Sequence, residues 1–447
     1  MGNGDAADGL SAPLLQRDVT DEPSAEKSRQ RTNRAVSIRV SSFCLPDNGG
    51  RNRDAQAQRL QSFRRTVQVL QLDHSRYRTS LLSWAIGSIL VVVVPILRLI
   101  FVKAASDDAQ YELVFQPFTV VVGVFLSLVA FIFLTQAIKK YGIRGVLFLD
   151  AAEEELMEVQ EEYDAVIEQS RILLAKLFIP TLLVYIAYKV WFFKEVELEP
   201  LPFEKKTTAI SLSVIIILTS LSWIFQTLIY LYSCILFSTV CSLQELKMLK
   251  FKGLLEHGFD PEFYFFKYDR VIKGLRATSH RFRFFLALIL TITLIGFLAS
   301  MYKVVEAERN GSATLMASEL IIINWISLCG VGLCLRSSSK LSHLHRRIVK
   351  AAAFMNARLT FEKANLADFT LANGANNQDT DDILQKFGTF FHNQDACSRR
   401  SALVNYLSSM SVGISVYGFV LDRFFIHASV GALLTTTWFI LGRSLND

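Results

Sequence analysis

The sequence predicts an all-α membrane protein with seven transmembrane helices, and three observations support this fold class. Of the 447 residues, 51% are hydrophobic, 20% are charged and 34 are phenylalanine, which places the chain outside the range of ordinary soluble domains. Seven runs stay apolar for about 20 residues, the length of helix that crosses a bilayer core of about 30 Å. Soluble helices are seldom apolar on all sides for so long, so a large soluble core is the weaker interpretation.

The seven predicted spans all lie in the larger, carboxyl-terminal part of the chain. Their ranges are 81–102, 113–137, 172–193, 208–240, 284–304, 313–335 and 424–441. Residues 1–58 are polar and rich in Ser, Gly, Asn, Asp and Arg, too poor in apolar side chains to bury a core. We therefore expect a disordered cytosolic tail at 1–58 and one membrane domain at 59–447.

The distribution of Lys and Arg predicts the orientation, because cytoplasmic loops carry the excess of these residues. Cations are dense before the first span, between spans four and five and between spans six and seven, and sparse in the other loops. This pattern places the amino terminus in the cytosol and, after seven spans, the carboxyl terminus on the outer side. The only N-x-[ST] acceptor, at Asn310, falls in the outer loop between spans five and six, so Asn310 is the predicted glycosylation site.

The cytoplasmic segments are predicted to extend the spans as amphipathic helices. From Leu149 to Val166 apolar residues recur at spacings of three and four opposite a run of glutamates, which predicts a helix that continues span two. The same spacing follows span four, from Leu243 to Leu254, and span six, from Leu341 to Leu359. Together these extensions predict a helical anchor bundle beneath the membrane.

The sequence shows no motif for catalysis or metal binding. It has no Gly-rich phosphate loop, no CxxC pair and no HExxH, and its histidines are scattered. His343 and His345 are two positions apart, so on a helix they point to different sides and make a poor metal pair. We therefore predict no enzyme activity, no catalytic or metal site, no cofactor and no nucleic-acid partner.

The stretch YGFVLDRFFIHASVGALLTTTWFILGRSL, residues 417–445, resembles the carboxyl-terminal signature of insect gustatory and odorant receptors. In that signature a Gly and an Asp-containing turn lead into a helix with Gly-Ala, then Thr-Tyr, five apolar residues and Gln-Phe. The residues that match are Gly418, Asp422, Phe424, Gly431, Ala432 and Thr435. Thr436 replaces the usual Tyr, and Gly442 with Arg443 replaces Gln-Phe, so the motif is kept in part. The nearest resemblance is to the plant gustatory-receptor-like branch of this superfamily.

The resemblance implies a homotetrameric, ligand-gated ion channel whose last helix is split. In the insect relatives a cytoplasmic part of that helix joins a central anchor bundle, and a membrane part lines the pore of a cation channel. Here residues 401–419 correspond to the cytoplasmic half, Asp422 and Arg423 to the joint, and 424–441 to the pore half. The alternative is a non-conducting membrane receptor or a small-molecule carrier on the same fold, although carriers commonly show internal repeats that these spans lack.

The pore-lining residues that the resemblance implies are Ala432, Thr435, Thr436, Phe439 and Arg443. Four of them, beginning with Ala432 and ending with Arg443, follow spacings of four, three and four and share one side of the helix. Two alternatives stay open. The threonines can bond back to carbonyls of their own helix. Arg443 can anchor the helix end in lipid headgroups instead of forming an outer ring of positive charge that favours anions.

The resemblance also implies a ligand pocket among the outer halves of several spans. The candidate residues are Tyr185, Tyr188, Phe192, Trp223, Asn324 and Trp325. The first three share one helical face, whereas an aromatic belt at the membrane interface is the alternative explanation of the whole set. The expected partners are three further copies of the chain, the lipid membrane and an unidentified small-molecule ligand. The expected location is the plasma membrane, with an endomembrane as the alternative.

Overall fold

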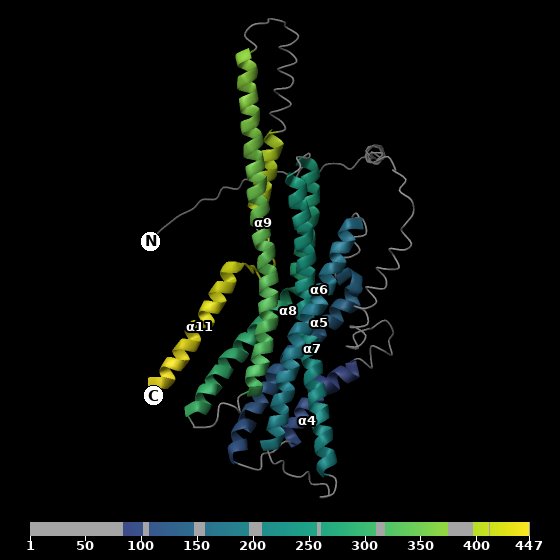
Figure 1. The fold of residues 1–447 in the computed structure, drawn as a ribbon, viewed down its shortest axis with the longest axis vertical. Coiled ribbons are helices and arrows are strands. Elements are labelled where there is room, and N and C mark those ends of the chain that lie inside the picture. Colours follow the sequence, from purple (N-terminus) through teal and green to yellow (C-terminus); the bar gives the residue numbers. More distant parts are fainter. Residues whose placement is uncertain are drawn as a thin grey trace, which may run out of the picture. The chain divides into compact units, whose positions relative to one another are not determined.

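The computed structural model describes residues 84–101, 107–146, 157–195, 208–256, 261–309, 318–373, 397–410 and 412–446. The chain divides into two units, Met1–Gln58 and Arg59–Asp447, and every described residue belongs to the second. That unit is built almost wholly of helices, as predicted (Figure 1). The expected tail at 1–58 and the expected glycan acceptor Asn310 lie outside the described residues.

Long helices follow one another along the described chain. The first apolar segment is helical from residue 84, contains the π-helical turn η1 (Ile89–Val93) and continues as α4 (Val94–Phe101). The next helices are α5 (Asp107–Val146), α6 (Met157–Glu195), α7 (Thr208–Glu256), α8 (Pro261–Arg309) and α9 (Ser318–Asn373). A helix over residues 397–409, the strands β1 (Ser415–Val416) and β2 (Phe419–Val420), and α11 (Arg423–Asn446) complete the described residues.

Five helices in the described part of the chain are long and apolar enough to cross a membrane, judged by length and composition. Their apolar stretches are Pro117–Gly142, Ala165–Val190, Ile216–Leu255, Glu262–Tyr302 and Glu319–Phe361, and the helix at Trp84–Leu97 is apolar but shorter. Each of these six stretches overlaps one of the first six predicted spans, although several run well beyond the predicted bounds. The helix α11 covers the range of the seventh, so the full set of seven and its orientation stay predictions.

Several helices continue far beyond the length that a membrane requires. With 56 residues, α9 is about 84 Å long at 1.5 Å per residue, more than twice the thickness of a bilayer core. The predicted extensions of spans four and six are therefore helical, since α7 runs to Glu256 and α9 to Asn373.

The helix that was predicted to extend span two is joined to span three instead, so this prediction is wrong. The helix α5 is kinked at Gly142, where φ is +66°, and ends at Val146, whereas α6 begins at Met157 and runs unbroken into span three. Tyr163 and Val166 therefore belong to the helix of the third span. Apolar spacing identifies a packed helix face, but it carries no information about which neighbouring span the helix joins.

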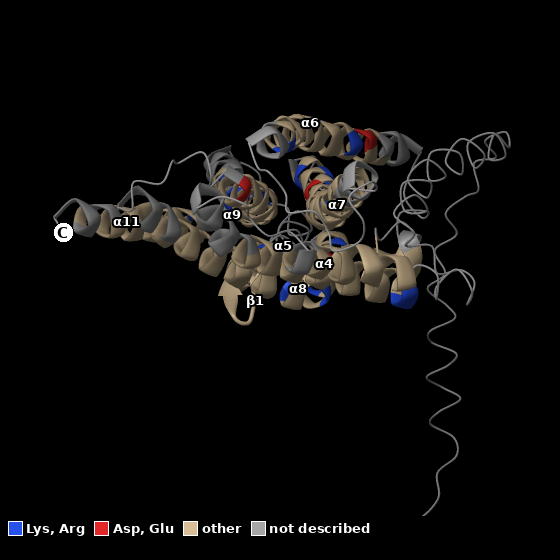
Figure 2. Cartoon of the chain, turned by 90° about the horizontal axis from the view of Figure 1, so that it is seen from below, with Lys and Arg blue, Asp and Glu red and all other residues tan. Residues whose placement is uncertain are grey.

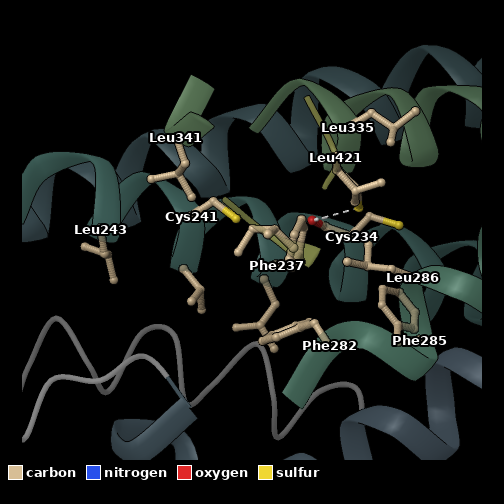
Figure 3. Close-up of a cluster of buried hydrophobic side chains, with 14 of the residues drawn as sticks. Cys234, Phe237, Cys241, Leu243, Phe282, Phe285, Leu286, Leu335, Leu341 and Leu421 are labelled. Atoms are coloured by element: carbon tan, nitrogen blue, oxygen red, sulfur yellow. Dashed lines mark hydrogen bonds between the residues drawn. The ribbon is translucent and has the colours of Figure 1, made fainter. Parts of the chain in front are cut away.

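The core of this unit lies where α7 meets its neighbours. Helix α7 contacts α5, α6, α8 and α9, and its side chains from Ile229 to Val240 are largely buried. Figure 3 shows apolar side chains gathered there: Cys234, Phe237, Cys241 and Leu243 from α7, Phe282, Phe285 and Leu286 from α8, Leu335 and Leu341 from α9, and Leu421. Because Leu421 precedes α11, the core also holds the segment that leads into the last helix.

A β-hairpin replaces the second half of the helix expected at 401–419. The helix ends at Ser409, and β1 pairs antiparallel with β2, with Ser415 opposite Val420 and Val416 opposite Phe419. Tyr417 (φ +47°) and Gly418 (φ +92°) form the two-residue turn, and positive φ at both positions is typical of a type I′ hairpin. The expectation of a helix through Phe419 is therefore wrong. The cause is Gly418 between two short β-branched segments, which favours a turn over a helix.

Candidate ligand site and terminal helix

A buried ion pair joins α6 to α9. Lys189 Nζ lies 3.2 Å from Glu319 Oε2, and the two side chains are only 6% and 7% exposed. Both residues lie within predicted spans, at 172–193 and 313–335. Charged groups inside a membrane are energetically costly, and they occur mainly where a protein binds or moves something. The ion pair therefore marks this region as a candidate functional site.

Aromatic rings surround the ammonium group of Lys189. Its Nζ lies 5.4 Å from the ring centroid of Tyr185 and 5.0 Å from that of Tyr188. Tyr185 stacks on Trp223 of α7, with 3.7 Å between the ring centroids and 2° between the planes. A cation close to aromatic rings gains electrostatic attraction, most of all where water is excluded. Two of the sequence-predicted pocket residues, Tyr185 and Tyr188, thus lie beside one buried charge, and a third, Trp223, stacks on Tyr185.

Two small cavities adjoin this cluster, each of about 30 Å³. The first is lined by Val94, Pro95, Thr119, Val120, Thr219, Ser222, Trp223, Gln226, Glu319 and Ile323. The second is lined by Gly123, Leu126, Trp223, Gln226, Thr227, Tyr230, Ile323 and Ile326. Trp223, Gln226 and Ile323 line both and form the wall between them. Each cavity has room for one or two water molecules.

The π-helical turn fixes two of the polar side chains at this wall. Pro95 lacks an N–H, so the carbonyls about one turn before it lose a helical donor. In a membrane such carbonyls need a donor from elsewhere in the protein. Ser222 Oγ donates to Leu90 O, and Gln226 Nε2 donates to Val91 O at 3.4 Å.

Asn324 and Trp325, two more of the predicted pocket residues, are not among the residues that line the two cavities. Asn324 is buried, and its Nδ2 donates to Ser300 Oγ of α8. Trp325 is 61% exposed, which fits the alternative of an interfacial belt better than a pocket. Phe192 lies on α6, but its side chain is outside the described part of the structure.

Sequence reasoning missed the polar residues of this site. The motif search followed aromatic residues, whereas Lys189, Glu319 and Gln226 lie in or at the edge of apolar runs. A single ionisable residue in a predicted span is itself the signal that could have found the ion pair. Among the described residues, no group of three or more His, Cys, Asp or Glu is placed to hold a metal ion.

The terminal helix α11 packs against the rest of the unit at its start. Phe425 and Ile426 pack against the core, and α11 contacts α8 and α9. Figure 1 shows α11, in yellow, diverging from the other helices, and Figure 2 shows it mainly in the tan of uncharged residues. Trp438 and Phe439 are 79% and 68% exposed. The helix therefore leaves most of its apolar surface uncovered within one chain.

The threonines of α11 bond to carbonyls of their own helix. Thr435 Oγ1 donates to Gly431 O at 2.9 Å, and Thr436 Oγ1 donates to Ala432 O at 2.7 Å. This is the back-bonding that membrane helices favour. It does not decide between a pore and a lipid-facing helix, because an oxygen that donates to a carbonyl still offers lone pairs on its outer side. The side chain of Arg443 lies outside the described residues.

Polar contacts from α8 and α9 hold the hairpin that precedes α11 and the nearby residue Met410. Ser279 Oγ donates to Ser415 O at 2.6 Å and accepts from Ser415 N–H at 2.9 Å. His345 Nε2 lies 3.1 Å from Met410 O, and His345 Nδ1 lies 2.6 Å from the Tyr268 hydroxyl. Because a carbonyl oxygen only accepts, Nε2 carries the proton and the Tyr268 hydroxyl donates to Nδ1. Burial lowers the pKa of His345, which keeps the ring neutral for this arrangement.

Asp422 joins the first turn of α11 to α9. Its Oδ1 accepts the N–H of Phe425 at 3.0 Å, as an N-cap does, and its Oδ2 accepts from Arg346 Nη2 at 2.9 Å. The hydrogen bond from Phe425 and the nearby Arg346 guanidinium lower the pKa of Asp422. The hairpin, the cap and the ion pair together fix where α11 begins.

Comparisons with known proteins agree with this architecture. The fold is similar to that of the insect olfactory receptor OR5 from Machilis hrabei in complex with eugenol, with a TM-score of 0.55 at 11% identity over 86% of this chain and 99% of the receptor. A second structure of the same receptor gives a TM-score of 0.51 at 11% identity over 83% of this chain and 90% of the receptor. The predicted likeness to the insect odorant receptor superfamily is thus confirmed for the fold.

No curated protein matches the chain. A family model described as "Protein of unknown function (DUF3537)" matches residues 58–431. This match spans most of the sequence and nearly the whole of the membrane unit, so the chain belongs to the DUF3537 family.

Proposed function

We propose that this chain is a chemoreceptor-like membrane protein, one subunit of a homotetrameric ligand-gated ion channel in which α11 lines the pore. The observation that carries the proposal is α11 itself. In a chain with the fold of an olfactory receptor, the terminal helix is fixed at its start by Asp422 and then leaves most of its side chains uncovered. Four copies around an axis would bury the apolar side chains that one chain exposes.

The pore face is assigned to Ala432, Thr435, Thr436, Phe439 and Arg443, which the sequence motif singles out. The exposure of Phe439 supports an apolar constriction that gates by dewetting once four copies meet. The orientation that we propose follows the cation distribution, with a cytosolic amino terminus and an outer carboxyl terminus. The location that we propose is the plasma membrane. The motif residues of α11 support assignment to the plant gustatory-receptor-like branch.

The ligand site is assigned to the buried cluster around Tyr185, Trp223 and Glu319. A small-molecule site is typically concave and largely apolar with a few placed polar groups, and this cluster has that composition. The cavities are far smaller than a pocket for a drug-sized ligand, so binding requires the shared wall to move.

Recording from the purified chain in planar bilayers tests the proposal, with eugenol as the first of a panel of small molecules because a relative of the same fold binds it. We expect ligand-dependent currents and expect Phe439→Ala to raise the current that flows without ligand. The control is Leu434→Ala, an equally exposed apolar residue that lies on the opposite side of the helix from Ala432 and Thr436. Ligand binding without current in any variant would support the alternative of a non-conducting receptor or carrier.

A further inference from the structure

We propose that a groove between α6 and α7 binds one anionic phospholipid of the cytoplasmic leaflet, with an acyl chain along the groove and the phosphate group near Arg171 and Lys176. The inference uses the orientation proposed above, in which the start of α6 is cytoplasmic. It concerns lipid binding alone and does not depend on ion conduction.

The groove has a volume of about 450 Å³, within the range of pockets that hold a single small ligand. It is lined by Glu168, Ser170, Arg171, Ile172, Leu174, Ala175, Phe178 and Ile179 of α6 and by Leu228, Tyr232 and Ile235 of α7. The two helices are joined at the polar end of the groove, where Thr239 Oγ1 donates to Ser170 Oγ at 2.8 Å, and again where Lys250 Nζ lies 2.9 Å from Glu162 Oε2. The groove is therefore present without any movement of a helix.

The groove lies on the side of the chain that faces the surrounding membrane. Helix α6 is at the edge of the unit, since only 17% of its apolar window is buried, against 72% for α7. Ile172 and Ile179, which line the groove from α6, are 47% and 53% exposed. Lipid is the medium that meets such a surface within a predicted span.

The groove has the length and the polarity of one leaflet. Glu168, Ser170 and Arg171 lie directly before the predicted span 172–193, whereas the lining from Ile172 to Ile179 is apolar. From Glu168 to Ile179 the helix rises by about 17 Å at 1.5 Å per residue. Half of a bilayer core of about 30 Å is about 15 Å. A phospholipid of the cytoplasmic leaflet thus matches the groove with its headgroup at the polar end and its chain along the apolar lining.

The charged side chains at the polar end are accessible to a headgroup. Arg171 Nη1 lies 2.9 Å from Glu168 Oε2, and the two side chains are 44% and 59% exposed. Exposed ion pairs of this kind contribute little to stability, so the positive charge of Arg171 stays available to a second anion.

Lys176 adds a second cation beside the groove. It is exposed on α6, one helical turn from Ile172 and therefore on a neighbouring part of the same surface. Helical side chains lean toward the helix N-terminus, and lysine extends toward the interface, so Lys176 is directed to the cytoplasmic headgroups. Because a charge exposed to hydrocarbon is costly, a phosphate group held at this place stabilises Lys176.

Two cations and one carboxylate leave an excess of positive charge at the polar end, in Arg171, Lys176 and Glu168. The cytoplasmic leaflet supplies the complementary charge, since it carries anionic lipids that basic sites between spans can bind. The charge therefore favours a phospholipid with net negative charge over a zwitterionic one.

Two lipids with the same acyl chains test this preference: dioleoylphosphatidylglycerol is anionic, and dioleoylphosphatidylcholine is zwitterionic. Native mass spectrometry of the full-length chain in mild detergent, titrated with either lipid, measures the Kd of the first lipid bound per chain. We expect the anionic lipid to bind about fivefold more tightly. Glycerol 3-phosphate, which has the phosphate group and no acyl chain, should not displace it, because apolar burial in the groove supplies most of the affinity.

The variant Arg171→Gln with Lys176→Gln removes both cations from exposed positions. We expect its Kd values for the two lipids to lie within about twofold of each other. The matched control is Lys139→Gln, which removes an exposed cation at the cytoplasmic end of span two, away from the groove, and should keep the preference of the wild type.

Ala175→Trp fills the groove and should weaken the binding of both lipids about tenfold, because the acyl chain loses its place. Its control, Ala187→Trp, places the same ring at an exposed position of α6 that does not line the groove, and should bind both lipids as the wild type does. Since all these positions are exposed, the variants should fold.

Equal Kd values for the two lipids in the wild type, an unchanged preference in the double variant, or equal effects of the two tryptophans would overturn the inference. Lipid binding that Ala175→Trp leaves unchanged, together with an altered number of subunits, would show that a second chain covers the groove instead. A lipid preference in a chain that carries no current would leave the inference intact and contradict the channel.

Discussion

At the scale of single residues, Pro95 explains why two polar side chains of α7 lie inside a membrane helix bundle. The missing N–H of Pro95 leaves backbone carbonyls of the first helix to be satisfied by Ser222 and Gln226. The sequence alone shows the proline and the glutamine, but their meeting depends on how two helices far apart in the sequence pack. The sequence also singles out the aromatic residues Tyr185, Tyr188 and Trp223 as candidates, but the pairing of Lys189 with Glu319 depends on how α6 packs against α9.

A double-mutant cycle tests this pairing. Gln226→Leu removes the donor to Val91 O and should lower the free energy of unfolding by about 1 kcal/mol. In a Pro95→Ala background the restored N–H satisfies a carbonyl of the first helix, so the same substitution should have a smaller effect. Denaturation of both series in mild detergent measures the coupling, and strictly additive effects would show that Gln226 does not compensate for the proline.

At the scale of elements, the long helices were predictable because runs of about 20 consecutive apolar residues are rare outside membrane-spanning helices. The hairpin at Ser415–Val420 was not predicted, because its two strands are short and lie next to a helix of similar composition. The extension at Tyr163 was assigned to the wrong neighbour, because helical periodicity is local and the identity of the adjoining span is not. The turn at Gly418 determines the hairpin, and the kink at Gly142 precedes the end of the span-two helix.

The cap of α11 gives a prediction at this scale. Asp422→Ala removes both the N-cap bond and the ion pair with Arg346, and should destabilise the start of α11 by about 1 kcal/mol. Asp422→Asn keeps the cap and should have a smaller effect. Hydrogen exchange at Phe425 and Ile426 measures the change. Asp269→Ala, which removes a partly exposed pair within α8, is the control and should leave this exchange unchanged.

The direction of the pKa shift of Asp422 predicts how the stability of this cap depends on pH. The pKa of Asp422 is lowered in the folded chain, mainly by the Phe425 N–H and by Arg346. Its stabilising effect is therefore fully present above the ordinary Asp pKa and is lost as the pH falls through the lowered value. The protection factor of the Phe425 amide against hydrogen exchange should fall in that acidic range in the wild type and much less in Asp422→Asn. An identical pH profile for both proteins would rule out the ionised cap.

At the scale of the whole molecule, the proposed channel consists of four chains that meet around α11. In that proposed assembly Arg443 forms a ring of positive charge at the outer mouth, and such rings usually favour anions. We expect Arg443→Gln to move the reversal potential under a salt gradient toward that of a cation-selective pore. Reversal potentials that coincide would instead make Arg443 a headgroup anchor and leave Thr436 and Phe439 as the pore-lining residues.

The central claim, that one face of α11 lines an ion pathway, is tested most directly by thiol modification during recording. Thr436→Cys places a thiol on the proposed pore face, and Leu434→Cys places one on the opposite side of the same helix. The background is the wild type, whose described cysteines are mainly buried. A charged, membrane-impermeant thiol reagent should reduce the current of Thr436→Cys and leave Leu434→Cys and the wild type unchanged. Equal modification of the two variants, or no effect on either, would contradict a pore along this helix.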